Sequence, residues 1–168
     1  ACHAANITPD IMCIGKGLTG GMMTLAATLT KEHIYEAFLN ESRAYALMHG
    51  ATFMANPLAC AVANASLDLF ESEPRLAQVA AIEAQMRLAL EPLRSHPAVI
   101  DMRIKGAIGV VQCDAARFDP FVLRPKLWES GCWLRPYGDI LYLTPPFTIS
   151  EVQLEQLTDA IVEAVCTL

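Results

Sequence analysis

The chain has 168 residues, a length that suits one ordinary domain or two small ones. Its composition is 54% hydrophobic, yet no uncharged apolar run approaches the roughly 18 residues that a transmembrane helix needs. The formal net charge is −6 and basic residues do not cluster, which disfavours nucleic-acid binding. We therefore expect neither a nucleic-acid nor a membrane partner. The excess apolar surface must be buried in a sheet, in an oligomer interface or against further sequence.

Six cysteines occur without any C-x-x-C pair, and several lie within apolar runs. This usage is typical of buried free thiols in a reducing cytosol and disfavours a disulfide scaffold. The first residues carry neither the basic nor the apolar region of a signal peptide, and the chain does not begin with Met. We expect a cytoplasmic protein and a segment of a longer polypeptide. The cysteines are Cys2, Cys13, Cys60, Cys113, Cys132 and Cys166.

The first part of the chain is predicted to contain two strands and then a helix. An apolar run at residues 11–14 indicates a buried strand, and residues 22–29 indicate a second strand of the same sheet. Thr30 can cap a helix that runs to about residue 39. Residues 40–50 have no clear period and are expected to form a loop.

A pair of long helices follows. Asn56 and Pro57 mark the start of the first, because asparagine caps a helix well and proline costs nothing at the first helical position. Its predicted apolar face consists of Leu58, Val62, Ala65 and Leu69. Pro74 breaks this helix, and a second, amphipathic helix continues after it. The predicted stripe of the second helix consists of Leu76, Val79, Ile82, Met86 and Leu90.

The last part of the chain is predicted to alternate strands and helices. Residues 99–113 alternate apolar and polar around a glycine and indicate two strands. A helix is expected over residues 118–131, followed by short strands at 132–134 and 140–143. Ser150 caps a C-terminal helix. The stripe of that helix consists of Glu151, Leu154, Leu157, Ile161 and Val165.

These elements predict an α/β protein with a domain boundary near Glu73. Residues 74–168 are expected to form helices on a mostly antiparallel sheet. Residues 1–73 hold two strands and two helices, which leave sheet edges unpaired and cannot close a core alone.

Lys16 ends the first predicted strand and lies between two glycines. Burial of an ammonium is costly, and this favours the neutral amine that can attack an aldehyde and form a Schiff base. The flanking glycines would let a flat cofactor approach the backbone. The alternative is a strand-end lysine that simply reaches solvent. A P-loop is excluded, because the G-x-x-x-x-G-K-[ST] spacing is absent.

Gly50 and Thr52 stand just before the helix that begins at Pro57. The start of a helix offers unpaired N–H groups and the positive end of the helix dipole, so a hydroxyl beside it suits a phosphate. Plain helix capping is the simpler alternative. His49 could contact a ligand, whereas the other three histidines are scattered and predict no metal site.

Arg135 lies in an apolar context, where a charge needs a partner. Its guanidinium can hold a carboxylate in bidentate fashion. That carboxylate could belong to a substrate or to an internal aspartate, and the sequence favours neither. Tyr142 can be a core aromatic or a site hydroxyl, and a core position is the simpler interpretation.

Four stretches, taken together and in this order, resemble the class III aminotransferases of fold type I, which use pyridoxal 5'-phosphate (PLP). The stretches are residues 10–29, 48–69, 104–111 and 133–146. The chain is most similar to the biotin-biosynthesis branch, which converts 8-amino-7-oxononanoate to 7,8-diaminononanoate with S-adenosylmethionine as amino donor. The resemblance implies a homodimer. It also implies that residues 1–73 are the C-terminal part of the PLP-binding large domain and that residues 74–168 are the small C-terminal domain.

The same resemblance implies a role for each of five residues. Lys16 would bind PLP as a Schiff base and then move a proton between substrate and cofactor. Thr52 would bind the cofactor phosphate across the dimer interface, and Gly50 would lie beside the substrate. Arg135 would hold the carboxylate of the oxo acid, with Tyr142 close to the substrate.

Two departures from the family pattern are visible. Ala51 stands where the biotin branch often has proline. The family residues that pair with the pyridine nitrogen, flank the ring and also grip the phosphate lie upstream of this segment. The 168-residue chain alone is therefore expected to bind PLP weakly and not to turn over. The alternatives are another class III aminotransferase acting on an ω-amino acid, which the stretch around Arg135 disfavours, and a folded domain without catalysis.

Overall fold

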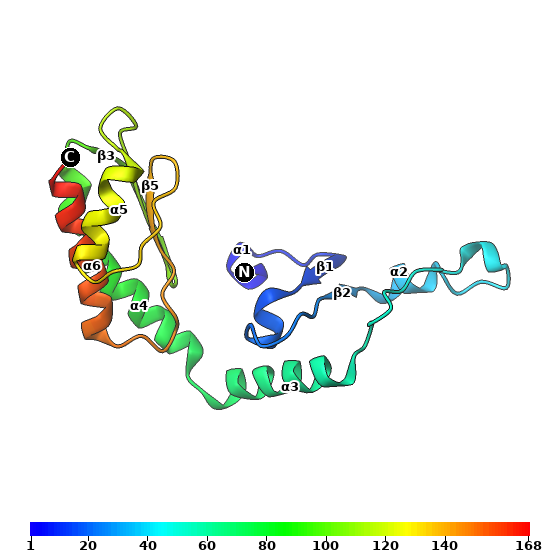
Figure 1. The fold of residues 1–168 in the computed structure, drawn as a ribbon. Coiled ribbons are helices and arrows are strands. Elements are labelled where there is room, and N and C mark those ends of the chain that lie inside the picture. The colour runs from blue at the N-terminus through cyan, green and yellow to red at the C-terminus, as the bar shows by residue number, and fades with distance from the viewer. The chain divides into compact units, whose positions relative to one another are not determined.

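The computed structural model describes all 168 residues, which form two units (Figure 1). Unit 1 is Ala1–Glu73 and unit 2 is Pro74–Leu168. The division falls at Pro74, between helix α3 (Pro57–Ser72) and helix α4 (Arg75–Leu90). No helix in the chain combines the length and the apolar character that crossing a membrane requires.

Unit 1 is built around one antiparallel strand pair. Strand β1 (Ile11–Ile14) pairs with β2 (Ala27–Thr30) along the whole length of both strands. At one end of the pair, Lys31 Nζ donates to Asp10 Oδ1 at 2.7 Å. The other elements are short: α1 (Cys2–Ala5), the 3-10 turns η1 (Lys16–Thr19) and η2 (Arg43–Tyr45), and α2 (Glu32–Glu36).

Strand β1 has the predicted bounds, but the prediction that it is buried is wrong. Ile11 is 56% exposed, because two strands form too small a sheet to cover both of their own faces. Strand β2 begins at Ala27, later than predicted. Gly20 and Gly21 have positive φ values of 58° and 84°, and they hold the preceding residues in a turn.

Helix α3 begins where the sequence predicted. The Oδ1 of Asn56 accepts a hydrogen bond from the N–H of Leu58 at 3.1 Å and caps the helix. The predicted apolar face is wrong, since Leu58 is 63% and Leu69 is 53% exposed. Ala59 and Ala63 are buried instead, because α3 packs against the short turn η1, where small side chains allow a close approach.

Unit 2 is a three-stranded antiparallel sheet with three helices on one face (Figure 1). The strand order is β3–β4–β5. On the covered face, Met102, Val111 and Leu141 join a single core with helix residues such as Leu90 and Leu127. This confirms the predicted layer of helices on an antiparallel sheet. The elements besides α4 are η3 (Glu91–Ser95), β3 (Val99–Lys105), β4 (Ile108–Cys113), α5 (Pro120–Glu129), β5 (Ile140–Leu143) and α6 (Glu151–Cys166).

Local signals located most elements of unit 2 correctly. Gly106, with φ 55°, turns the chain between β3 and β4. Ser150 Oγ accepts from the N–H of Gln153 at 3.2 Å, and Gln153 Oε1 accepts from the N–H of Ser150 at 3.1 Å, which makes a capping box. Two predictions are wrong. Residues 132–134 form no strand, and Leu76 is 86% exposed rather than part of a buried stripe.

All six cysteines are free, as expected, but they differ in burial. Burial raises the pKa of the Cys113 thiol to about 11, and the negative charge of Asp139 adds to this effect. Burial also raises the pKa of Cys132. Cys13 and Cys166 are exposed, so the prediction of buried thiols is wrong for these two, and the remaining pair is half-buried.

Glu83 links helix α4 to the turn between β3 and β4. Its carboxylate accepts from Arg87 Nη2 at 2.7 Å and from the N–H of Gly106 at 2.5 Å. The same Arg87 nitrogen also donates to the carbonyl of Ile104. The Arg87 hydrogen bond, followed by the Gly106 N–H, lowers the pKa of Glu83 below the ordinary 4.5.

Replacing Glu83 with glutamine is expected to lower the free energy of unfolding near neutral pH. A carboxyl whose folded-state pKa is depressed stabilises the fold above its unfolded-state pKa, and this contribution disappears as the pH falls through the folded-state pKa. The difference between wild type and Glu83→Gln should therefore shrink on acidification, which urea unfolding at several pH values would measure. Glu91→Gln, which breaks only an exposed ion pair with Arg94, is the control. A constant difference at all pH values would contradict the prediction.

Candidate active site

Lys16 directly follows Gly15, just beyond β1, and opens the turn η1. Its φ is +46°, in the left-handed region that residues with a side chain rarely adopt. Such a conformation persists where the surroundings impose it. Here η1 packs against α3 and ends at Thr19, which is only 1% exposed and donates its hydroxyl hydrogen bond to the carbonyl of Met23. The packed turn therefore fixes the backbone from which Lys16 projects.

The side chain of Lys16 is exposed, so the prediction of a buried lysine is wrong for this chain. The four ion pairs of the chain involve Lys31, Arg87, Arg94 and Arg103, and none involves Lys16. A primary amine can form a covalent bond with the aldehyde of PLP, and no ion pair within the chain engages the amine of Lys16.

Gly50 and Thr52 lie in the exposed segment between η2 and α3. Helix α3 is capped by Asn56, so plain capping does not account for Thr52. At Gly50, an added Cβ would lie 2.5 Å from the Cε of Met54, at the flexible end of that side chain. No hydrogen bond joins Gly50 or Thr52 to Lys16, which belongs to a different segment of unit 1, the turn η1.

Arg135 and Tyr142 are brought together in unit 2, where both line a pocket of about 320 Å³. Tyr142 is half-buried on β5, while its neighbours Leu141 and Leu143 are buried in the core. Because side chains alternate along a strand, Tyr142 lies on the sheet face opposite the core. The core interpretation of Tyr142 is therefore wrong. Its side chain lines the pocket instead.

Arg135 is exposed and belongs to none of the chain's ion pairs. The aspartate closest in sequence, Asp139, already accepts from Gln112 Nε2 at 2.9 Å. Gln112 in turn accepts from Arg103 Nη1 at 3.0 Å. Arg135 therefore has no internal aspartate as a partner, and it lines the pocket without an ion pair of its own. A planar fork of this kind binds a carboxylate or a phosphate.

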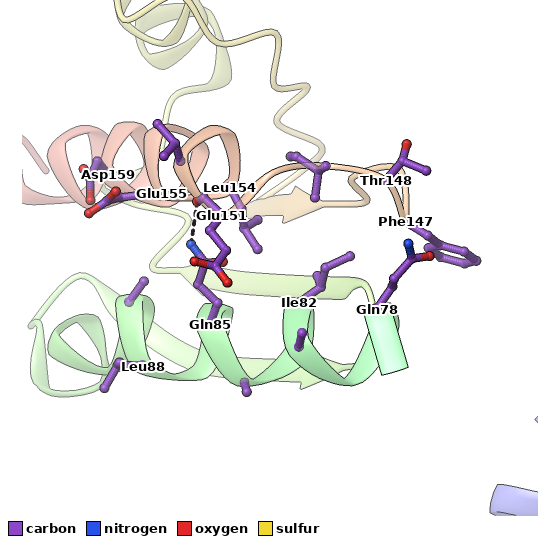
Figure 2. Close-up of a pocket in the computed structure, with 15 residues that line it drawn as sticks. Gln78, Ile82, Gln85, Leu88, Phe147, Thr148, Glu151, Leu154, Glu155 and Asp159 are labelled. Atoms are coloured by element: carbon purple, nitrogen blue, oxygen red, sulfur yellow. Dashed lines mark hydrogen bonds between the residues drawn. The ribbon is translucent and has the colours of Figure 1, made fainter. Parts of the chain in front are cut away.

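A larger pocket lies elsewhere, between α4 and the start of α6, and has a volume of about 870 Å³ (Figure 2). Gln85 Nε2 donates to the carbonyl of Glu151 across it at 2.7 Å. Its wall on α6 carries Glu151, Glu155 and Asp159, one helical turn apart. None of the predicted site residues lines this pocket. We assign the candidate site to the smaller pocket because that one carries an unpaired cation and a tyrosine hydroxyl.

The residues of the smaller pocket that were not predicted as site residues include Trp133 and Thr144, which carry an indole and a hydroxyl. Trp133 had a detectable signal, since it lies two positions before Arg135 in the sequence. Side chains two apart in an extended chain point to the same side. Thr144 had no comparable signal, because it follows the end of β5 in an irregular segment.

Comparison with known proteins gives one family and many relatives. The family model described as "Aminotransferase class-III" matches residues 1–165. An adenosylmethionine-8-amino-7-oxononanoate aminotransferase from Buchnera aphidicola subsp. Acyrthosiphon pisum is 44% identical over 98% of this chain. A protein of the same name from Mycobacterium leprae is 44% identical over 97% of this chain. The chain spans 38% of the length of the first relative and 37% of the second.

Solved structures give the same fold. The adenosylmethionine-8-amino-7-oxononanoate aminotransferase from Methanocaldococcus jannaschii matches with a TM-score of 0.85 and 34% identity, over 95% of this chain and 39% of that one. An amine transaminase from an uncultivated Pseudomonas species, in its PLP-bound form, matches with a TM-score of 0.87 and 29% identity, over 98% of this chain and 40% of that one. The fold is therefore that of part of a PLP-dependent aminotransferase.

Proposed function

Since this chain belongs to the class III aminotransferase family, we propose that it contributes Lys16 and Arg135 to an enzyme that aminates 8-amino-7-oxononanoate in biotin biosynthesis. The observation that supports the proposal most is the pocket in which Arg135, without an internal partner, lies beside Tyr142. A guanidinium in that state suits the carboxylate of an oxo acid. The names of the relatives supply the substrate and S-adenosylmethionine as the amino donor.

We propose that Lys16 holds PLP through a covalent bond from its Nζ to the aldehyde carbon of the cofactor. The exposed amine and the backbone fixed by η1 fit this role. When bound, PLP supplies the electron sink that makes the substrate Cα–H acidic. With the cofactor in place, the amine of Lys16 would also remove the proton at the substrate Cα, acting as base and then as acid.

Thr52 is proposed to bind the phosphate of PLP across a homodimer interface, with Gly50 beside the substrate. Support comes from the position of both residues, which lie on an exposed segment and make no hydrogen bond to Lys16 of the same chain. The exposed apolar side chains around this segment, among them Met48 and Phe53, suit burial by a second protomer. Units 1 and 2 are correspondingly proposed to be the C-terminal part of the PLP-binding domain and the small domain, in a cytoplasmic enzyme.

A second candidate function is the amination of other carbonyl compounds. The Pseudomonas amine transaminase shares the fold with a similar TM-score, so the fold does not select the substrate. Arg135 favours a substrate with a carboxylate, because an amine or ketone without one would leave the guanidinium unpaired in the pocket.

Replacing Arg135 with lysine in the native gene product is expected to raise KM for 8-amino-7-oxononanoate by about 10- to 100-fold, with a smaller change in kcat. A lysine keeps the charge but loses the two parallel hydrogen bonds, a loss of roughly 1.5–3 kcal/mol. The measurement is steady-state amination with PLP and S-adenosylmethionine. Arg117→Lys, an exposed arginine outside the pocket, is the matched control. If the wild-type enzyme aminated ketones that lack a carboxylate as well as it aminates 8-amino-7-oxononanoate, the proposed substrate would be rejected.

A further inference from the structure

Trp128 and Trp133 are the only tryptophans of the chain, and their rings are stacked. The ring centroids lie 5.4 Å apart and the ring planes differ by 5°. Helix α5 ends in a turn at Gly131, whose φ is +72°. Within this turn the N–H of Cys132 returns to the carbonyl of Leu127 at 2.9 Å. The end of α5 therefore folds Trp133 back onto Trp128.

The segment after this turn alternates in burial, although it pairs with no strand. Cys132 and Leu134 are 3% and 7% exposed and anchor the segment in the core. Trp133 and Arg135 are exposed and line the same pocket of about 320 Å³. In an extended chain, residues two apart project to the same side. The anchors on one side thus hold the indole and the guanidinium next to each other on the other side.

Trp133 is 79% exposed, although an indole is one of the largest apolar groups that a protein can bury. One face of the ring is fixed by Trp128, so little rotamer freedom remains to be lost when a ligand binds. The adjacent cation, Arg135, has no partner within the chain. A rigid apolar wall beside a free carboxylate-binding group matches a ligand with a hydrocarbon chain attached to a carboxylate.

We propose that Trp133 is a specificity-determining residue, which selects oxo acids with a linear methylene chain next to the carboxylate, and that Trp128 is its positioning residue. This inference rests on the proposed function, because it assigns the chain-length preference of the site in which Arg135 holds the carboxylate. Each methylene group that the indole removes from water should strengthen binding about fourfold.

The main test measures kcat/KM of the native gene product for linear oxo acids that differ only in the number of methylene groups. The wild type should gain about fourfold per added methylene until the pocket is filled. Trp133→Ala should reduce this gain to less than twofold, Trp133→Phe should recover part of it, and Trp128→Phe should lie between Trp133→Ala and the wild type. An equal loss of kcat/KM at every chain length in Trp133→Ala would indicate a purely structural role and overturn the inference.

A second readout does not depend on amino transfer. In the 168-residue chain, tryptophan emission reports this pair alone, and heptanoate and acetate serve as long and short carboxylate probes. Heptanoate should alter the emission at concentrations at least about tenfold lower than those that acetate requires. Arg135→Gln should weaken the response to both probes. Trp133→Ala, followed through Trp128, should remove the advantage of heptanoate. Equal responses to the two probes, or no response, would overturn the inference.

The two readouts separate the failure of this inference from the failure of the proposed function. If the wild-type product aminates no oxo acid, the proposed function fails, and the carboxylate titration still decides whether Trp133 selects chain length. If the product aminates oxo acids without a preference that depends on Trp133, the function stands and the inference is wrong. Far-ultraviolet circular dichroism of each variant checks that the helices of unit 2 remain folded.

Discussion

Replacing Lys16 with alanine is expected to abolish the visible absorbance of bound PLP in the native gene product and to lower its turnover by at least about 10³-fold. Two functions would be lost together, the covalent bond that holds the cofactor and the amine that moves the proton. The loss should exceed that of any other single substitution in the site. Absorbance spectra and single-turnover rates on the wild type and the variant measure the two functions separately.

Lys31→Ala is the matched control for this substitution. Lys31 is also a lysine beside the β1–β2 pair, but it is half-buried and its amine is already engaged with Asp10 at 2.7 Å. An exposed ion pair of this kind contributes little to stability, so the control should keep both the absorbance and the turnover. A visible band that persists in Lys16→Ala, or that disappears equally in Lys31→Ala, would show that Lys16 does not hold the cofactor.

The second large effect is expected in the core of unit 2. Leu90→Ala should lower the free energy of unfolding of this unit by about 2–5 kcal/mol, because Leu90 is 0% exposed and its removal leaves a cavity among helix and sheet side chains. The measurement is urea unfolding of the 168-residue chain. The unfolding transition can be followed by the loss of helical circular dichroism, so no buried tryptophan is needed as a fluorescence probe.

Leu88→Ala provides a control of identical chemistry on the same helix. Leu88 lies two residues away in α4 but is 80% exposed, so its loss should change the free energy of unfolding by less than about 0.5 kcal/mol. The difference between the two variants isolates burial, because the helix propensities of the substituted residues are the same. Equal effects of Leu90→Ala and Leu88→Ala would mean that the core of unit 2 is not packed as described.

The sequence predicted those features that depend on local chemistry. Asn56 and Ser150 cap the helices that they were expected to cap, and Gly106 turns the chain between two strands. A cap or a turn of this type is decided by the hydrogen-bonding groups and φ range of one or two residues. Pro74 likewise separates two helices, because proline disfavours a helical conformation of the preceding residue. This effect is local and does not depend on how the two helices pack.

The sequence failed where a distant partner decides the outcome. The most apolar face of α3 contains Leu58 and Leu69, yet the helix buries Ala59 and Ala63 against η1. Periodicity indicates which face can be buried, whereas the packing partner determines which face is buried. Residues 132–134 were predicted as a short strand, and their burial does alternate, but they pair with no neighbouring strand.

The candidate site was predictable to a similar extent. Arg135 and Tyr142 were identified from residue type and from the family resemblance, and the structure places them in one pocket. Their alternatives, an internal aspartate partner and a core tyrosine, could be decided only by the sheet, which sets the face of each side chain. The roles of all five residues remain predictions, and those of Lys16, Gly50 and Thr52 depend on groups that a single chain does not bring together.

The graded burial of the cysteines has a practical consequence for the two units. Cys13 in unit 1 and Cys166 in unit 2 are exposed, whereas Cys113 and Cys132 are buried and their raised pKa values keep the unreactive thiol form dominant. With the two half-buried cysteines replaced by serine, a maleimide dye should label one position in each unit. The separation of the units, free or in a dimer, then becomes a distance that energy transfer between the dyes can measure.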